Sequence, residues 1–249
     1  MKVSNSQIQT FKRCRRLWEL QYKYELKPVK ISPVLETGSA YHNKLESILK
    51  TGTFEPDNDV KANAMAEAFR RHILPRIKGT FEPEVSFEYN TAGGNTLVGR
   101  YDGISANSLI EHKSTGGVIN GSYWTAVDMD EQVLTYMLAS GKRKVVYTVC
   151  QKPKLKQLKN ETPEQFQERC IRWYDVDTET KIAVQEIIHT DAEVEQHAKN
   201  IDLMCEEIGS CKNFYRNTAF CMYYGRLCEF APICRNYDPN RQYIGFERK

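Results

Sequence analysis

The sequence predicts one α/β domain with a C-terminal appendage. Three consecutive strand-like segments, 84–89, 97–104 and 108–114, occupy the middle of the chain, and segments of helical periodicity precede and follow them. The 249 residues are enough to bury a substantial core, and the chain has no internal repeat, low-complexity tract or evident linker. We therefore expect a single domain over residues 1–249, with a sheet flanked by helices.

The composition is that of an ordinary soluble globular protein, with 41% hydrophobic and 27% charged residues. The net charge of +3 permits nucleic-acid binding through a local patch but does not require it. No apolar run approaches the roughly 20 residues of a membrane span, and the polar first residues do not resemble a secretory signal. We expect a cytoplasmic protein, whose eight cysteines then favour metal or cluster binding over disulfides.

Local signals place the other elements. A first helix is expected from Ser6 to about Tyr24, with Ser6 and Gln9 as a capping box, and two more over 37–50 and 60–77. The remaining expectations are a hairpin turn at 92–95, a helix over 124–140 ending at Gly141, a strand over 144–151, a short helix from Thr162 with Pro163 at its first position, at least one strand within 174–188, a helix from Thr190 to about Glu207, and a loop-like tail from Lys212.

The second and third central strands carry the first candidate site. If their turn is centred on Ala106 and Asn107, antiparallel pairing sets Asp102 directly opposite Glu111. Like charges opposed in this way destabilise a sheet. A divalent cation between the two carboxylates would remove the conflict.

Strand alternation adds a lysine to this pair. Lys113 lies on the face of Glu111, and His112 points to the other side. Two acids and a lysine at this spacing suit a metal-and-water site for phosphodiester cleavage. The alternative is a solvated hairpin face with ordinary charges. These residues alone support the metal site and the solvated face about equally.

Two helical pairs and a group of cysteines complete the candidates. Gly38 and His42 lie one helical turn apart, as do Gln132 and Tyr136, so each pair shares a helix face. By itself a lone histidine is more often a partly buried, hydrogen-bonded core residue than a metal ligand, and the glutamine and tyrosine alone would be a polar helix edge. The spacing of the last three cysteines, at 221, 228 and 234, is too irregular for a zinc ribbon, and a metal would need a fourth thiolate. The other late or central cysteines are interpreted as small buried apolar residues, namely Cys150, Cys170, Cys205 and Cys211.

Taken in order, these elements resemble the PD-(D/E)XK nuclease superfamily. The likeness is to its RecB-like and AddB-like branch with a four-cysteine iron–sulfur cluster, which includes CRISPR-adaptation exonucleases and phage-encoded nucleases. It extends from Ser4 to about Arg235, and although each motif is weak alone, their order is specific. The motifs are Cys14, Gly38-x-x-x-His42, Asp102, Glu111-x-Lys113, Gln132-x-x-x-Tyr136, and Cys221, Cys228 and Cys234.

The resemblance implies a restriction-endonuclease-like mixed sheet flanked by helices. It also implies a Mg²⁺- or Mn²⁺-dependent deoxyribonuclease, an exonuclease on single-stranded DNA or duplex ends. The expected setting is recombination, repair or phage genome processing in a bacterial host, with a helicase or recombination protein as partner. The alternative is an inactive DNA-binding or scaffolding module of a nuclease complex.

Roles for individual residues follow from the same resemblance. His42, Asp102, Glu111 and the backbone carbonyl of His112 would hold the metal, and Lys113 would orient or deprotonate the attacking water. The catalytic residues would thus be Asp102, Glu111 and Lys113. Gln132 and Tyr136 would border the site and contact the DNA backbone or a catalytic partner, and we expect both to face the substrate. The family's proline before the aspartate is replaced here by Tyr101.

The resemblance also implies a [4Fe–4S] cluster on Cys14, Cys221, Cys228 and Cys234. The cluster would tie the C-terminal cysteine-rich tail, 212–235, to the N-terminal helix within 1–30. The six-residue gap between Cys221 and Cys228 is longer than in many relatives. Zinc on the same thiolates, or four plain buried thiols, are the alternatives.

Basic and aromatic residues surround these cysteines. Arg15 and Arg16, in the run 12–16, are candidates for binding DNA phosphates, although such runs are often solvated helix faces. The aromatic residues of the tail could stack on single-stranded bases or surround the cluster; they are Phe214, Tyr215, Phe220, Tyr223 and Tyr224.

Overall fold

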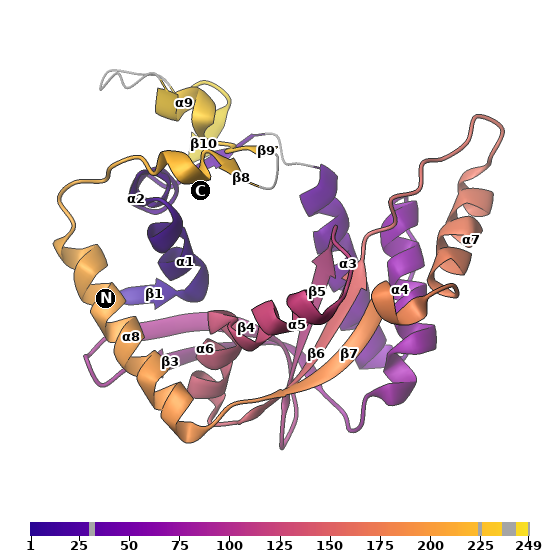
Figure 1. Cartoon of the computed structure of the whole chain (residues 1–249), viewed down its shortest axis with the longest axis horizontal. Coiled ribbons are helices and arrows are strands. Elements are labelled where there is room, and N and C mark those ends of the chain that lie inside the picture. The colour runs from indigo at the N-terminus through magenta and orange to yellow at the C-terminus, as the bar shows by residue number, and fades with distance from the viewer. Residues whose placement is uncertain (30–32, 224–225, 236–242, 249) are drawn as a thin grey trace. The chain divides into compact units, whose positions relative to one another are not determined.

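The structure is a computed structural model that describes residues 1–29, 33–223, 226–235 and 243–248 (Figure 1). The chain forms two compact units, each assembled from separate stretches of sequence. Unit 1 contains residues 1–32, 88–99 and 198–249, and unit 2 contains residues 33–87 and 100–197. Both units are therefore discontinuous in the sequence.

The expected mixed sheet is confirmed. It has six strands in the order β1-β4-β5-β6-β7, with β3 also paired to β4. The β4–β5 and β6–β7 pairs are antiparallel, whereas β1–β4 and β5–β6 are parallel. The strands are β1 (Lys2–Ser4), β3 (Glu82–Asn90), β4 (Thr96–Ile104), β5 (Leu109–Thr115), β6 (Lys144–Gln151) and β7 (Ile182–Ile188).

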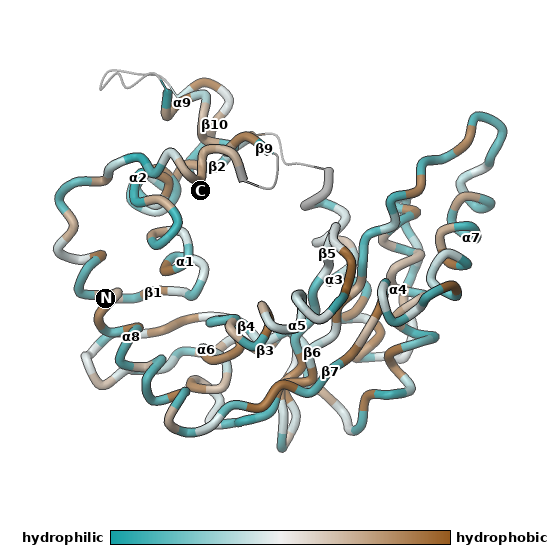
Figure 2. The backbone as a smooth tube through the Cα atoms, in the orientation of Figure 1, coloured by the Kyte–Doolittle hydropathy of each residue, from teal (hydrophilic) through white to brown (hydrophobic). Residues whose placement is uncertain are grey.

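Helices cover both faces of the sheet in unit 2. Helices α3 (Pro33–Thr51), α4 (Val60–His72) and α7 (Pro163–Tyr174) belong to one face, and α5 (Gly121–Asp128) and α6 (Glu131–Ser140) to the other (Figure 1). Strand β6 serves both: Tyr147 and Val149 pack in the core with α6, while Cys150 packs in the core with α3 and α4. A strand covered on both faces is mostly apolar, and every residue of β6 from Val145 to Gln151 is buried. Figure 2 shows β7 largely in the hydrophobic colour and helix α7 largely in the hydrophilic colour.

The central hairpin forms as predicted. Ser105 N–H donates to the Ser108 carbonyl at 2.9 Å, so the turn lies at 106–107, and β4 and β5 end within a residue or two of their expected limits. The register joins Gly103 to Ile110 and Ile104 to Leu109. Continued by one step, it sets Asp102 across from Glu111.

The first helix differs from the prediction at both ends. It begins at Asn5, because Ser4 is its N-cap and forms the capping box with Gln7 rather than with the residues predicted. It is also interrupted, since Cys14 has an extended backbone with φ −162°. The segment therefore consists of α1 (Asn5–Arg13), α2 (Arg15–Trp18) and a π-helical turn, η1 (Glu19–Lys23).

Three further helices have different limits from those predicted. The helix expected over 124–140 is two helices, α5 and α6, because the side chain of Asp130 caps a new N-terminus by accepting from Gln132 N–H at 2.9 Å. The end of α6 at Gly141, with φ +72°, is confirmed. Helix α3 begins earlier, at Pro33, and α4 ends at His72 before a short 3-10 turn, η2 (Leu74–Arg76).

The C-terminal expectations are largely confirmed. Strand β6 has the predicted limits, Thr162 caps α7 with proline at its first position, and α8 (Asp191–Ser210) follows a cap at Thr190. The tail is less loop-like than expected. It contains η4 (Thr218–Phe220), β8 (Met222–Tyr223), β9 (Arg226–Leu227), α9 (Ala231–Arg235) and β10 (Phe246–Arg248), the last paired with β2 (Leu26–Pro28). Among the helices of the described residues, none is long and apolar enough to cross a membrane.

Candidate active site

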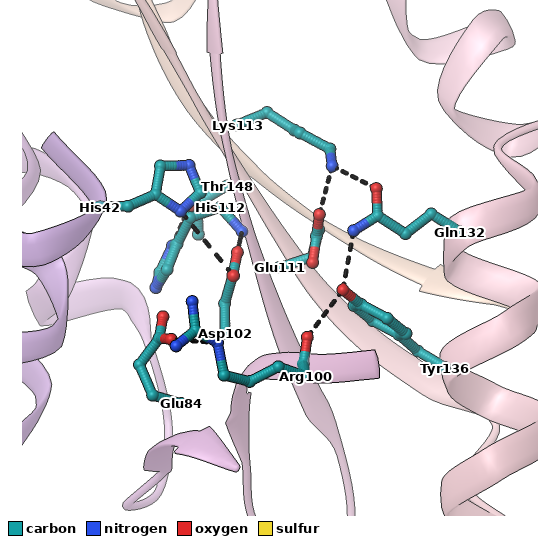
Figure 3. Close-up of polar contacts among 10 residues, drawn as sticks. All are labelled: His42, Glu84, Arg100, Asp102, Glu111, His112, Lys113, Gln132, Tyr136 and Thr148. Carbon is teal, nitrogen blue, oxygen red and sulfur yellow. Dashed lines mark hydrogen bonds and ion pairs between the residues drawn. The ribbon is translucent and has the colours of Figure 1, made fainter. Parts of the chain in front are cut away.

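Asp102 links the two strands of the central hairpin through its side chain. Its Oδ2 accepts a hydrogen bond from His112 N–H at 2.7 Å, and its Oδ1 lies 3.7 Å from Nδ1 of His42 (Figure 3). Burial alone would raise the pKa of Asp102, but contacts with His42 and His112 outweigh it and lower the pKa to about 2. Asp102 is therefore ionised and ready to ligate a cation.

Glu111 is the most deeply buried charged residue of the site, at 1% exposure. Its Oε1 is paired with the ammonium of Lys113, and its Oε2 is buried without a hydrogen-bond partner. Burial and the charge of Asp102 raise the pKa of Glu111 to about 8, although Lys113 opposes the shift. This burial excludes the interpretation of the hairpin as an ordinary solvated face.

Lys113 is held from two sides. Its Nζ contacts Glu111 and also donates to Oε1 of Gln132 at 2.6 Å (Figure 3). Burial would lower the pKa of Lys113, but Glu111 and Asp130 raise it overall. The side chain thus remains an ammonium ion and acts as a hydrogen-bond donor.

Gln132 and Tyr136 form a chain of hydrogen bonds behind this lysine. Gln132 Nε2 donates to the Tyr136 hydroxyl at 2.8 Å, which in turn donates to the backbone carbonyl of Arg100 at 2.8 Å. Tyr136 is only 7% exposed. The contacts make these two residues supports for Lys113, and their predicted role in substrate binding stays a prediction.

His42 and His112 reach the site from different elements. His42 comes from α3, and its ring lies edge-on to that of His112, with centroids 6.3 Å apart. His112 points away from Glu111 as predicted: its Nδ1 is 2.6 Å from the Thr148 hydroxyl, and its ring packs edge-on against Phe69. Burial lowers the pKa of His112 to about 4, so the ring is neutral. The motifs gave no sign of Thr148, whose partnership depends on the β5–β6 register.

The space beside Gly38 has an unexpected occupant. A Cβ atom at this position would lie 3.2 Å from Nζ of Lys152 and 3.5 Å from Oγ of Ser114. The absence of a side chain at Gly38 therefore makes room for a lysine at the end of β6. The motif gave no indication of Lys152.

The donor set fits a hard divalent cation. Asp102 and Glu111 offer carboxylate oxygens, which suit Mg²⁺ or Mn²⁺, and the orphaned Oε2 of Glu111 lacks the partner that such an ion would provide. Within the described residues, no three His, Cys, Asp or Glu side chains are already grouped closely enough to hold a metal. Binding would thus require the side chains to draw together.

The four predicted cluster cysteines lie in unit 1. Cys14, Cys228 and Cys234 are half-buried against one apolar core with Leu17 and Phe230. One backbone hydrogen bond joins two of the four, since Cys228 N–H donates to the Cys221 carbonyl at 2.8 Å. Cys14 Sγ accepts from Asn217 N–H at 3.4 Å. All four cysteines are free thiols.

Among the other cysteines, Cys150, Cys170 and Cys205 are buried as predicted. Cys211 is partly exposed at the end of α8, so its interpretation as a buried residue was wrong.

The two arginines predicted to contact DNA both have acidic partners. Arg15 pairs with Glu207 and lies over the rings of Phe11 and Tyr215, and Arg16 pairs with Glu19. Of the aromatic residues in the tail, Phe214 stacks on Trp18 with centroids 5.8 Å apart. Tyr224 and the side chain of Tyr223 fall outside the described residues. DNA contact by Arg15 and Arg16 stays a prediction.

Comparison with known proteins identifies the family. The model of the PD-(D/E)XK nuclease superfamily matches residues 2–235, so the chain belongs to this superfamily, whose members generally use divalent metal ions. No curated protein matches the sequence.

Solved structures agree on the fold. The crystal structure of SSO0001 has 19% identity and a TM-score of 0.51, covering 94% of this chain and 85% of that one. A putative exonuclease from Eubacterium rectale has 10% identity and a TM-score of 0.52, covering 91% and 88%. An alkaline exonuclease from Laribacter hongkongensis has 14% identity and a TM-score of 0.35, covering 84% and 90%. At these identities the first two likenesses establish the fold alone.

Proposed function

We propose that the protein is a Mg²⁺- or Mn²⁺-dependent deoxyribonuclease that hydrolyses phosphodiester bonds. The observation that carries the proposal is the buried carboxylate of Glu111, which has an orphaned oxygen and stands with Asp102 and Lys113 on the central hairpin of a nuclease-superfamily chain. Without a cation between them, the negative charges of Asp102 and Glu111 would repel each other across the hairpin. Exonuclease action on single strands or duplex ends is favoured by the superfamily and by the putative exonuclease that this chain resembles in structure.

Each residue then has a separate task. Asp102, Glu111, His42 and the carbonyl of His112 would hold the metal, which supplies a polarised phosphate and a more acidic water when bound. Lys113 keeps its proton and donates hydrogen bonds from Nζ, so it stabilises charge developing on a phosphate oxygen. Gln132 keeps that ammonium aimed at the site.

We further propose that Cys14, Cys221, Cys228 and Cys234 bind a [4Fe–4S] cluster, as in the RecB-like and AddB-like branch. The cluster would join the tail, 212–235, to the N-terminal segment. The apolar core shared by Cys14, Cys228 and Cys234 supports it, as does the backbone hydrogen bond from Cys228 to Cys221. Anaerobic purification should give a brown protein, and a colourless protein that contains zinc would contradict the proposal.

The biological setting proposed is DNA recombination, repair or phage genome processing, with a helicase or recombination protein as partner. An inactive DNA-binding module is the rival. The presence of Asp102, Glu111 and Lys113 together favours activity, because a site that has lost its chemistry has no reason to keep two opposed acids.

The test is digestion of end-labelled single- and double-stranded DNA in Mg²⁺ and in Mn²⁺. Lys113→Ala should abolish cleavage, while Lys144→Ala, which removes an exposed lysine paired with Glu186, should leave it unchanged. Circular dichroism would verify that both variants fold. Cleavage by Lys113→Ala at the wild-type rate would overturn the mechanism, and a wild-type protein that binds DNA without cutting it would favour the rival.

A further inference from the structure

An ion pair that no nuclease motif includes lies beside the candidate active site. Nε of Arg100, on β4, is 2.5 Å from Oε2 of Glu84, on β3 (Figure 3). The two side chains differ in exposure, at 63% for Arg100 and 18% for Glu84. Arg100 precedes Asp102 by two residues, so an accessible cation stands next to the proposed metal ligand.

Glu84 has an unusual backbone. Its φ of +59° lies in the left-handed region, which residues with a side chain seldom adopt. Such conformations persist only where the surroundings impose them, and they are concentrated at functional sites. In an extended strand like β3, this conformation redirects the side chain of Glu84, whose carboxylate meets the guanidinium of Arg100.

Arg100 is also tied to the catalytic residues through its main chain. Its carbonyl accepts the Tyr136 hydroxyl at 2.8 Å, and Tyr136 is connected to Lys113 through Gln132 (Figure 3). The hydrogen-bonded chain therefore runs from the ammonium of Lys113 to the main chain of Arg100, and the guanidinium of Arg100 is held separately by Glu84.

The charges around Arg100 favour a role for its guanidinium in binding a phosphate. Burial raises the pKa of Glu84 and Arg100 opposes the rise, while the nearby charges of Asp102 and Glu46 add to it. Acidic groups therefore gather around this ion pair. An arginine has five N–H donors in a planar fork that matches phosphate oxygens. With Nε engaged by Glu84 and most of the side chain exposed, the outer part of the fork can receive a phosphate.

We propose that Arg100 binds a backbone phosphate of the DNA strand held at the catalytic centre, and that Glu84 is a positioning residue that orients the guanidinium. This inference rests on the proposed nuclease function. It assigns Arg100 a substrate-binding role and gives the strained backbone of Glu84 a purpose.

The first test replaces the arginine. Arg100→Ala should raise KM about tenfold and leave kcat within about twofold, because a charge-assisted contact to the substrate is lost without a change in the reacting groups. Arg100→Gln should behave similarly, and it keeps the bulk of the side chain should alanine impair folding.

Direct binding provides a second readout. Anisotropy of a short fluorescein-labelled single strand, measured in EDTA over a salt series, should show that the slope of log K against log salt becomes shallower by about 0.7 in Arg100→Ala, as expected for one phosphate contact. The matched control is Arg76→Ala, which removes an exposed arginine paired with Glu179 elsewhere in unit 2. The control should change neither KM nor the slope.

Two Glu84 variants of equal charge test the positioning role. Glu84→Gln keeps an oxygen that can accept from Arg100 Nε, whereas Glu84→Ala does not. KM should therefore be at least about threefold higher in Glu84→Ala than in Glu84→Gln. In an Arg100→Ala background the two variants should have equal KM, since no guanidinium remains to be oriented.

The outcomes separate the two proposals. A wild-type protein that cleaves DNA, together with an Arg100→Ala variant of unchanged KM and salt slope, would overturn the inference and leave the nuclease function intact. A persistent difference between the Glu84 variants in the Arg100→Ala background would overturn the positioning role. Failure of the wild-type protein to cleave would instead contradict the nuclease function.

Discussion

In unit 2, the charged side chains of the candidate active site project from long strands and helices, whereas in unit 1 the four cysteines come from helix ends and short pieces of the tail. The acids are held by other protein groups: Asp102 by His112 N–H, and Glu111 by Lys113. Among the cysteines, Cys228 is hydrogen-bonded to Cys221 through the backbone, and Cys14, Cys228 and Cys234 pack against an apolar core.

This difference indicates what each site requires of its ligand. The acidic side chains already have protein partners without a metal, so a bound metal should govern reactivity more than folding. The cysteine region is built from elements that are too short to be stable alone, so the proposed cluster should govern stability. The following predictions test that division.

The largest effect is expected at Asp102. Asp102→Asn keeps an oxygen that can accept from His112 N–H but removes the charge, so the cleavage rate should fall about a thousandfold with little change in Tm. Rates on labelled DNA and thermal unfolding followed by circular dichroism measure the two quantities. A large loss of Tm would show that the acidic site also governs folding.

Cys228→Ser should show the opposite pattern. Loss of a cluster ligand should remove the brown colour and lower the stability by about 3 kcal/mol, a fall in Tm of about 6–12 °C. Cys211→Ser, at a partly exposed cysteine outside the proposed set, is the control and should keep both colour and Tm. If the two variants unfold at the same temperature, the cysteines do not stabilise the region through a shared ligand.

Metal affinity should depend on pH through Glu111. Its pKa is raised to about 8, so below that pH a metal must displace a proton from this carboxyl. Apparent Mn²⁺ affinity should therefore fall roughly tenfold per pH unit below about pH 8, as measured by calorimetric titration. Glu111→Gln should bind weakly and lose the dependence on pH.

The same shift fixes the sign of a stability effect without added metal. Because the folded carboxyl holds its proton more tightly than the unfolded one, Glu111 favours folding less as pH rises from about 4.5 to about 8. Added Mn²⁺ should offset this loss at the upper end of the range.

A smaller effect is expected at Gln132. Gln132→Ala removes one of the two groups that hold Lys113, so kcat should fall about tenfold while the protein stays folded. Steady-state kinetics would measure this fall. An unchanged kcat, with only KM altered, would instead support the predicted role of Gln132 as a substrate contact.

The smallest effect is expected at the start of unit 1. Ser4→Ala removes the capping box with Gln7 and should destabilise the protein by about 1 kcal/mol, or about 2–4 °C in Tm. Cleavage should be unaffected. A larger change in activity than in Tm would mean that α1 contributes to catalysis beyond its folding.

The parts of the fold that sequence could predict were those with strong local signals. The β-branched run of β6 and the turn at 106–107 are examples, and the hairpin turn was enough to bring Asp102 and Glu111 together. The break at Cys14 could not be predicted, because helical periodicity continues through it and the extended backbone there depends on its tertiary surroundings. At Asp130 a capping residue was present, but it stood inside an uninterrupted helical pattern.

Only those site residues that belong to the sequence motifs could be predicted from the sequence. Asp102, Glu111 and Lys113 lie on one short hairpin, so their spacing reports their geometry. Arg100 and Glu84 come from different strands, and their contact depends on a left-handed backbone at Glu84 that no residue type announces. Thr148 was hidden for a similar reason, since its partner follows from the pairing of β5 with β6.

The length of the turn at 106–107 determines which residues of β4 and β5 face each other in the site. The chain distance from Asp102 to Lys113 is set by a two-residue turn, and side chains alternate between faces at every step beyond it. Removing one residue from the turn would shift the pairing by one position and set Ile110 or His112 opposite Asp102 in place of Glu111, yet the change in sequence would lie outside every nuclease motif. In a distant relative, the length of this turn is therefore as informative about activity as the presence of the acids themselves.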